Sequence, residues 1–254
     1  PFAPLQDTWI REGVGWISDL TYRLLVGASK DHANSNPAVS LLQWKSQPMR
    51  DRTISSAEVG FFQYMSASCS SKTVEIHPLT SSWDDWTTWA TQPSVNPWTG
   101  TSSSFSKNIG ASGCTPAGGF VTANVTAMVQ AWANGADHGG LANYGMHLNI
   151  PVGSERNYSF ERRLCSADYD PTHTTCNRAS RTPYLKFTYT NNPPWAPTTP
   201  VISNTRMFGG KLWAHTSSPT FTSSAIGVYG AQVSLNFEVR DSATATVLVA
   251  SCIT

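Results

Sequence analysis

Short segments in which apolar and polar residues alternate recur throughout residues 1–190, and turn-forming residues separate them. Near the end of this part, Leu185, Phe187 and Tyr189 fall on one face of an extended chain, with polar residues between them. Such alternation is typical of antiparallel sheets with one buried face. The pattern predicts strands over Asp7–Glu12, Tyr22–Val26, Val39–Trp44, Ala57–Met65, Thr73–Leu79, Gly119–Ala123, Tyr144–Ile150, Tyr158–Leu164 and Tyr184–Tyr189.

One segment follows a different period. Val125, Met128, Val129 and Trp132 stand at the spacing of an apolar helical stripe. Gly135 follows as a natural helix end. We expect the strands to form a β-sandwich and this segment to form one short helix that covers one end of it.

Residues 191–200 contain four prolines and predict an extended linker between domain 1–190 and domain 201–254. The second domain is short, because an immunoglobulin-like or fibronectin-III-like sandwich needs about seven strands and roughly 100 residues. The sequence therefore predicts an all-β protein with a partial second β-sandwich, whose open edge something else must cover. Its expected strands are Thr220–Ser223, Gln232–Arg240 and Thr246–Ser251.

The composition indicates an extracellular protein. Charged residues make up 13% of the chain, about half the usual share, while ten tryptophans are present. The net charge of +1 argues against nucleic acid as a partner. No apolar run approaches the roughly 20 residues that span a bilayer. We expect a secreted protein, with attachment to a cell surface as an option.

The five cysteines are not spaced for zinc, and loop cysteines suit an oxidising compartment. Four cysteines permit three connectivities. The pairing that we favour is Cys69–Cys114 and Cys165–Cys176, because each cysteine of the first pair lies in a loop-like segment and the second pair closes a short loop. Cys252 is then left over and would suit a partner cysteine beyond this chain.

Several short motifs occur in an ordered series, from Asp7-Thr8-Trp9-Ile10-Arg11 through the Trp-rich turn 81–93 and the helix 125–132 to the closing segment 181–189. Their order and spacing resemble the DNRLRE-type domain of large secreted or surface-attached bacterial proteins. The resemblance implies a jelly-roll-like β-sandwich and a non-enzymatic role, and some relatives are classed as binding modules for acidic polysaccharides. Residues 47–52 depart from the family, since they interrupt its apolar strand. Further motifs are Leu24-Leu25-Val26-Gly27, Ala57-Glu58-Val59 and Asn143-Tyr144-Gly145-Met146.

Motifs of catalysis are missing from the sequence, which has neither a nucleophile elbow nor a zinc-protease helix nor a phosphate loop. Asp84 and Asp85 are adjacent, so on a strand their carboxyl groups would point to opposite faces. We therefore expect a protein that is not an enzyme and that needs no cofactor, except for one option. Asp168 and Asp170, with His173 nearby, could hold a structural calcium ion, and the alternative is an ordinary Asp-Pro turn.

Sugar binding would need exposed aromatic rings. Trp83, Trp89 and Trp132 fall on positions that resemble family core positions. The candidates for a carbohydrate-binding surface are instead in turn-like segments: Trp16, Trp86 and Trp98.

Two functions remain open from the sequence. The first is a carbohydrate-binding module of a larger secreted protein, whose partner is a polysaccharide. The second is a structural subunit of a fibre or stalk, whose partial domain self-assembles by accepting strands from a neighbouring subunit or chain segment.

Overall fold

The structure is a computed structural model that describes residues 1–15, 22–30, 35–96, 100–107, 109–110, 114–168, 170–193, 197–214, 220–224, 235–240 and 247–253. The chain forms two compact units, Pro1–Thr190 and Asn191–Thr254. In the described residues no helix is long and apolar enough to cross a membrane.

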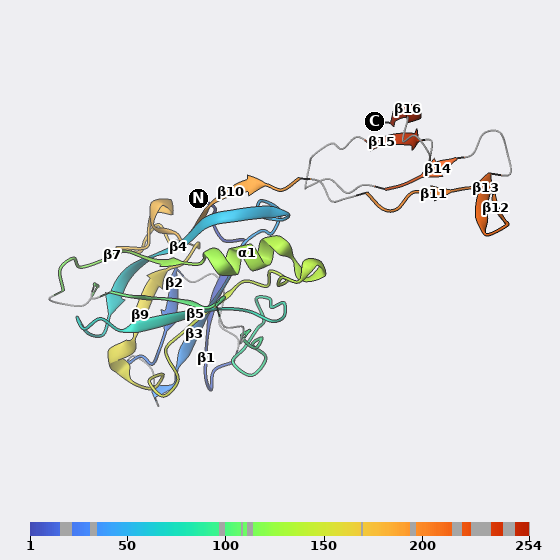
Figure 1. Cartoon of the computed structure of the whole chain (residues 1–254). Helices are drawn as coiled ribbons and strands as arrows, with labels where there is room; N and C mark the ends of the chain where they lie inside the picture. Colours follow the sequence, from blue (N-terminus) through green and yellow to red (C-terminus); the bar gives the residue numbers. More distant parts are fainter. Residues whose placement is uncertain are drawn as a thin grey trace. The chain divides into compact units, whose positions relative to one another are not determined.

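The first unit is a β-sandwich of two antiparallel sheets (Figure 1). Along the chain, the strands alternate between the two sheets at nearly every step, and β5 and β6 are the only consecutive described strands of this unit that pair. Repeated crossing between sheets is the pattern of jelly-roll-like sandwiches. One sheet has the order β1 (Gln6–Arg11), β3 (Ala38–Gln43), β8 (Met146–Asn149), β5 (Thr73–Pro78), β6 (Ser103–Ser106). The other has the order β10 (Tyr184–Asn191), β4 (Arg52–Ser66), β9 (Arg162–Cys165), β2 (Arg23–Val26), with β7 (Gly119–Asn124) also on β4.

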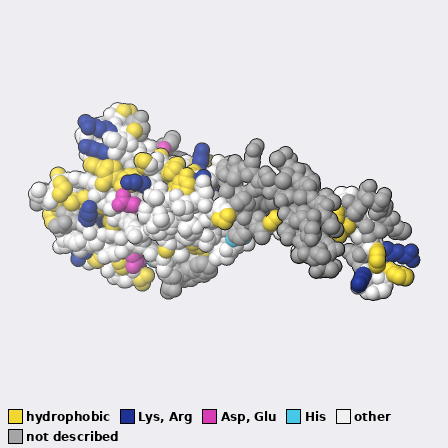
Figure 2. Space-filling model, turned by 45° about the horizontal axis from the view of Figure 1, so that its top comes forward, with side chains coloured by type: hydrophobic (Ala, Val, Ile, Leu, Met, Phe, Trp, Pro, Cys, Tyr) yellow, Lys and Arg dark blue, Asp and Glu magenta, His cyan; other side chains and the backbone are white. Residues whose placement is uncertain are grey.

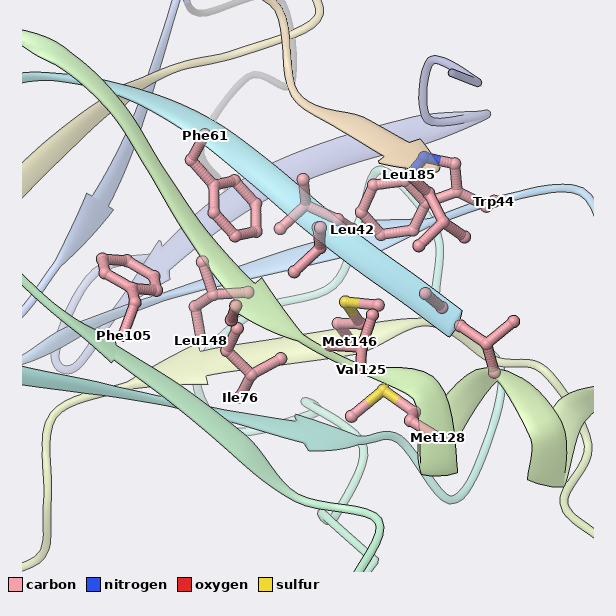
Figure 3. Close-up of a cluster of buried hydrophobic side chains, with 14 of the residues drawn as sticks. Leu42, Trp44, Phe61, Ile76, Phe105, Val125, Met128, Met146, Leu148 and Leu185 are labelled. Atoms are coloured by element: carbon pink, nitrogen blue, oxygen red, sulfur yellow. The ribbon is translucent and has the colours of Figure 1, made fainter. Parts of the chain in front are cut away.

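The core lies between the sheets and confirms the alternation seen in the sequence. In β5 every second residue is buried: Val74 is opposite Phe105 of β6, and Ile76 is opposite Leu148 of β8, all in the core. Figure 3 shows the side chains of Ile76, Phe105 and Leu148 pointing into one apolar layer together with Leu42, Phe61 and Met146. Their burial is the main favourable contribution to folding.

The expected helix is present as α1 (Thr126–Asn134), and it ends at Gly135, whose φ is 72°. Its buried Met128, Val129 and Trp132 complete the core beside β4. Side chains also fasten it to that strand, because the Gln130 side-chain oxygen accepts the Ile54 N–H at 2.7 Å. The prediction of a single short α-helix over the sandwich is confirmed for the described residues.

Some expected strands differ from those observed. Tyr158–Phe160 forms a 3-10 turn, η3, because the Asn157 side chain accepts the Ser159 N–H and caps it, so β9 starts only at Arg162. The polar β6 gave no apolar signal in the sequence. Tyr189 was expected on the inner face, yet it is 41% exposed, because β10 extends beyond the core there and Arg52 stacks on its ring. Residues 47–51 form a turn before β4.

Two disulfides join the pairs favoured from the sequence, Cys69–Cys114 and Cys165–Cys176. Cys165 and Cys176 are buried, whereas the first bond ties two surface loops. Cys252 lies in a strand whose side chains are outside the description.

The described part of the second unit contains three separate two-stranded ladders. The turn of β12–β13 is Gly209-Gly210, with positive φ at both residues, as a tight hairpin requires. This hairpin and β11 were not expected from the sequence. The pairs are β11 (Val201–Ile202) with β14 (Phe221–Thr222), β12 (Thr205–Phe208) with β13 (Lys211–Ala214), and β15 (Leu235–Arg240) with β16 (Val247–Ile253).

Candidate functional site

The tryptophans expected at the surface have different outcomes. Trp86 is 70% exposed, whereas Trp16 and Trp98 lie outside the described residues. Trp83 is buried as expected, and its indole N–H donates to the Tyr144 carbonyl at 2.9 Å. Trp89 is only partly buried, and this tryptophan, rather than Trp86, borders the groove that is described below.

The residues named as calcium ligands lie in a segment where Asp170 caps a turn. The Asp170 carboxylate accepts hydrogen bonds from the Thr172 N–H and hydroxyl at 2.7 and 2.6 Å, which hold its pKa below the usual value. His173 Nδ1 accepts two backbone N–H groups, and its ring stacks on Tyr22. Asp168 is exposed. Across the described residues, no group of three His, Cys, Asp or Glu side chains is placed to hold a metal ion.

The sheet that contains β1, β3, β8, β5 and β6 has an outer face that is covered over only part of its area. Ile10 of β1 and Leu41 of β3 point outward, yet they are buried because the loop after β5 folds over them. Trp83 and Trp89 of that loop pack on this small outer cluster. The loop therefore forms a wall on the sheet, and the outer residues of β8 and β5 lie beyond it.

Four polar side chains stand in two cross-strand pairs beside this loop. Glu75 of β5 is opposite Asn149 of β8, and His77 is opposite His147. These side chains point outward because the alternate residues, among them Ile76, are in the core. The register of the two strands thus brings two imidazoles, a carboxylate and an amide together on one face.

A series of hydrogen bonds connects Asn149, Glu75, His77 and Ser102. The Glu75 carboxylate accepts from the Asn149 amide at 3.1 Å and lies 3.3 Å from His77 Nε2. His77 Nδ1 lies 2.8 Å from the Ser102 hydroxyl. Hydroxyl, imidazole and carboxylate follow one another as in nucleophilic enzymes. Here the same carboxylate oxygen also accepts from the Asn149 amide, so the three groups are one part of a larger polar network.

The network continues towards the tryptophan wall. His147 Nδ1 lies 3.3 Å from the Asn149 side-chain oxygen, and His147 Nε2 lies 3.3 Å from the Gln92 side-chain oxygen. Gln92 in turn donates to the Trp89 carbonyl at 3.0 Å. The positions of Gln92 and the tryptophan wall are thereby tied to the sheet.

His147 sits at the centre with both ring nitrogens facing amide oxygens. Its side chain is 8% exposed, and burial lowers its pKa to about 4, although the hydrogen bond to Asn149 acts in the opposite direction. The ring is therefore neutral at pH 7 and carries one N–H. It acts as a neutral polar group of the groove.

A groove of about 530 Å³ lies along this wall. Its apolar lining comes from Pro37, Val39 and Ile150, and Trp89 contributes an aromatic side. Such a lining can bury the apolar face of a small molecule.

The remaining lining of the groove is polar. Gln92, His147 and Asn149 stand on one side, and the ion pair of Arg156 with Glu12, 2.5 Å apart, stands on another. The Arg156 side chain is 57% exposed. The groove thus combines an apolar lining with both donors and acceptors of hydrogen bonds. This combination suits a ligand with many hydroxyl groups.

A comparison with models of known protein families finds no match, and a search of curated proteins finds no significantly similar sequence. A function for this groove can therefore be inferred only from its lining residues. Sequence reasoning missed His147, Asn149, Glu75 and Gln92, because they come from three distant segments. The one available signal was the outward position of His77 and Glu75 in an alternating strand.

Proposed function

We propose that this chain is a non-catalytic extracellular β module that binds polysaccharide in the groove beside Trp89. The observation that carries the proposal is the groove itself, with an aromatic side, an apolar lining and a row of amide and imidazole groups. A pyranose ring has the complementary character, since its C–H face packs on an aromatic ring while its hydroxyl groups exchange hydrogen bonds with polar side chains.

Two further observations support an extracellular setting. The two disulfides are typical of proteins from oxidising compartments. The motifs between residues 7 and 189 resemble the DNRLRE-type domain, whose members belong to large secreted or surface-attached bacterial proteins. The crossing of strands between two sheets agrees with the jelly-roll-like fold that this resemblance implies.

The test is a glycan array probed with the whole chain and two matched variants. Trp89→Ala removes the aromatic side of the groove, while Trp86→Ala removes a more exposed tryptophan from the same loop that does not line it. The affinity of Trp89→Ala should be lower than that of the wild type by up to about tenfold, because an aromatic contact is worth up to about 1.5 kcal/mol. The affinity of Trp86→Ala should stay near the wild-type level.

Because Trp89 also packs on the outer cluster, a second variant is needed. Gln92→Ala removes a polar lining group, and equal unfolding midpoints of this variant and the wild type would show that folding is preserved. Loss of glycan binding in Trp86→Ala, but not in Trp89→Ala, would show that the binding site lies at Trp86 and not in the groove. No bound glycan on the array would reject the proposal.

The second candidate function is a subunit of a fibre or stalk, and the second unit favours it. Met207, Phe208 and Trp213 of the β12–β13 ladder are 61%, 75% and 57% exposed. Figure 2 shows hydrophobic side chains uncovered beside Lys and Arg on this unit. A two-stranded ladder is marginally stable alone, so strands from a neighbouring subunit or chain segment would complete it. Light scattering over a range of concentrations tests this function. A monomer at every concentration argues against self-assembly. Polymers of the wild type that do not form in the Phe208→Ser variant support it.

A further inference from the structure

The outer face of the second sheet carries a pattern of its own. Antiparallel pairing puts Glu58 of β4 opposite Asn124 of β7, Gly60 opposite Thr122, and Phe62 opposite Phe120. These residues point outward because Val59 and Phe61 are in the core. One end of this face is therefore polar and the other end is aromatic.

A tyrosine of β10 lies across the middle of the face. A Cβ atom at Gly60 would come within 2.3 Å of the Tyr184 ring, so the ring rests on the strand backbone where glycine leaves room. The Tyr184 hydroxyl donates to the Glu58 carboxylate at 2.8 Å, which fixes the ring. Burial and this bond raise the Tyr184 pKa to about 12, so the hydroxyl stays a donor at pH 7.

Further rings extend this platform. The Phe120 ring centroid lies 5.6 Å from that of Tyr184 and 5.4 Å from that of Phe62. The Arg181 guanidinium lies 4.5 Å from the centroid of the Phe62 ring. All three rings are half-buried, so each keeps part of its surface open to solvent. The result is a fixed aromatic patch rather than a set of mobile side chains.

A groove of about 520 Å³ begins beside this patch. Glu58, Thr122 and Asn124 line it together with Lys186 and Thr188 of β10. The lining offers a carboxylate, an amide, hydroxyls and an ammonium group within one shallow depression. Aromatic rings next to such groups provide the same combination of stacking and hydrogen bonding as the Trp89 groove, with different residues.

We propose that this face is a second glycan-binding site, so that one chain binds two polysaccharide strands. The two grooves lie on the outer faces of opposite sheets, and a single saccharide cannot occupy both. The inference rests on the proposed function for its ligand class, and it adds bridging of polysaccharides as an activity. Bridging arises from two sites on one rigid sandwich and needs no oligomer.

The experiment uses the whole chain and hexasaccharides from xylan, β-glucan and polygalacturonate, titrated calorimetrically. The wild type should bind two hexasaccharides per chain, and Trp89→Ala and Tyr184→Ala should bind one each. Lys186→Ala, which leaves the aromatic packing intact, should weaken one of the two sites several-fold. Tyr189→Ala removes an exposed ring of the same strand that belongs neither to the groove lining nor to the patch of Tyr184, Phe120 and Phe62, and it should behave like the wild type.

The matching polysaccharide gives the second readout. The wild type should precipitate it, whereas Trp89→Ala and Tyr184→Ala should bind it without precipitation, and the double variant should lose binding. One hexasaccharide per wild-type chain, with Tyr184→Ala and Lys186→Ala unchanged, overturns the second site and leaves the proposed function intact. Absence of binding by the wild type to every hexasaccharide and every arrayed glycan overturns both.

Discussion

Acidification should destabilise this protein through His147. Its pKa is lowered from 6.5 to about 4 by burial in the folded chain. Between these values the unfolded chain binds a proton that the folded chain does not bind, so the free energy of unfolding decreases as the pH falls through this range. A difference of about 2.5 pKa units corresponds to a loss of about 3 kcal/mol between pH 7 and pH 4.

The variant His147→Gln isolates this effect. Glutamine keeps a polar side chain between Asn149 and Gln92, but it does not titrate. Glu75 and His77 nearby, and Glu12 and Glu155 along the groove, are present in both proteins, so their contributions largely cancel in the comparison. Guanidinium unfolding at pH 4, 5, 6 and 7, followed by tryptophan fluorescence, should show a stability difference between wild type and variant that changes by about 3 kcal/mol.

Two results would refute the reasoning. Parallel stability curves for the wild type and His147→Gln would show that His147 does not link protons to folding. An NMR titration with a His147 midpoint near 6.5 would show that burial does not disfavour its charged form. His138→Gln is the matched control for the substitution itself, since the His138 side chain is 36% exposed.

Other predictions concern the framework of the first unit. Alanine at both positions of Cys69–Cys114, whose sequence separation is 45, should cost about 4 kcal/mol of unfolding free energy, whereas alanine at both positions of Cys165–Cys176, with a separation of 11, should cost about 3 kcal/mol, because a longer loop restricts the unfolded chain more. Chemical denaturation of the two variants compares them, and equal or reversed losses would contradict the loop argument. Met128→Ala should lower the unfolding free energy by about 2–5 kcal/mol in the same assay, because Met128 is fully buried on the inner face of α1; a loss below about 1 kcal/mol would show that the helix is not part of the core.

The alternation and the helical stripe were sufficient to predict most elements, because both are local. A strand exposes every second side chain to the same face, so the buried Val74 and Ile76 could be assigned from β5 alone. The same holds for α1, where Met128 and Trp132 mark the face that is buried. Local patterns failed at η3, where the Asn157 cap outweighed an apolar segment, and at the polar β6.

The grooves could not be predicted in this way. Gln92 meets His147 across 55 residues, and Asn149 meets Glu75 across 74, because strands of this sandwich pair with partners distant in the chain. Leu41 shows the same limit, since it points outward and is buried only because the Trp83 loop folds over it.

The sequence by itself determined the all-β class and the helix, whereas it only favoured one disulfide pairing among three, and the structure decided that pairing. Which tryptophan lines a groove was decided by tertiary structure, because Trp86 and Trp89 share one loop and differ only in what that loop packs against. Alternation states which side of a strand is apolar, but it does not state which strand lies beside it. The side chains that gather on an outer face are therefore fixed only when long-range pairing closes the sheets.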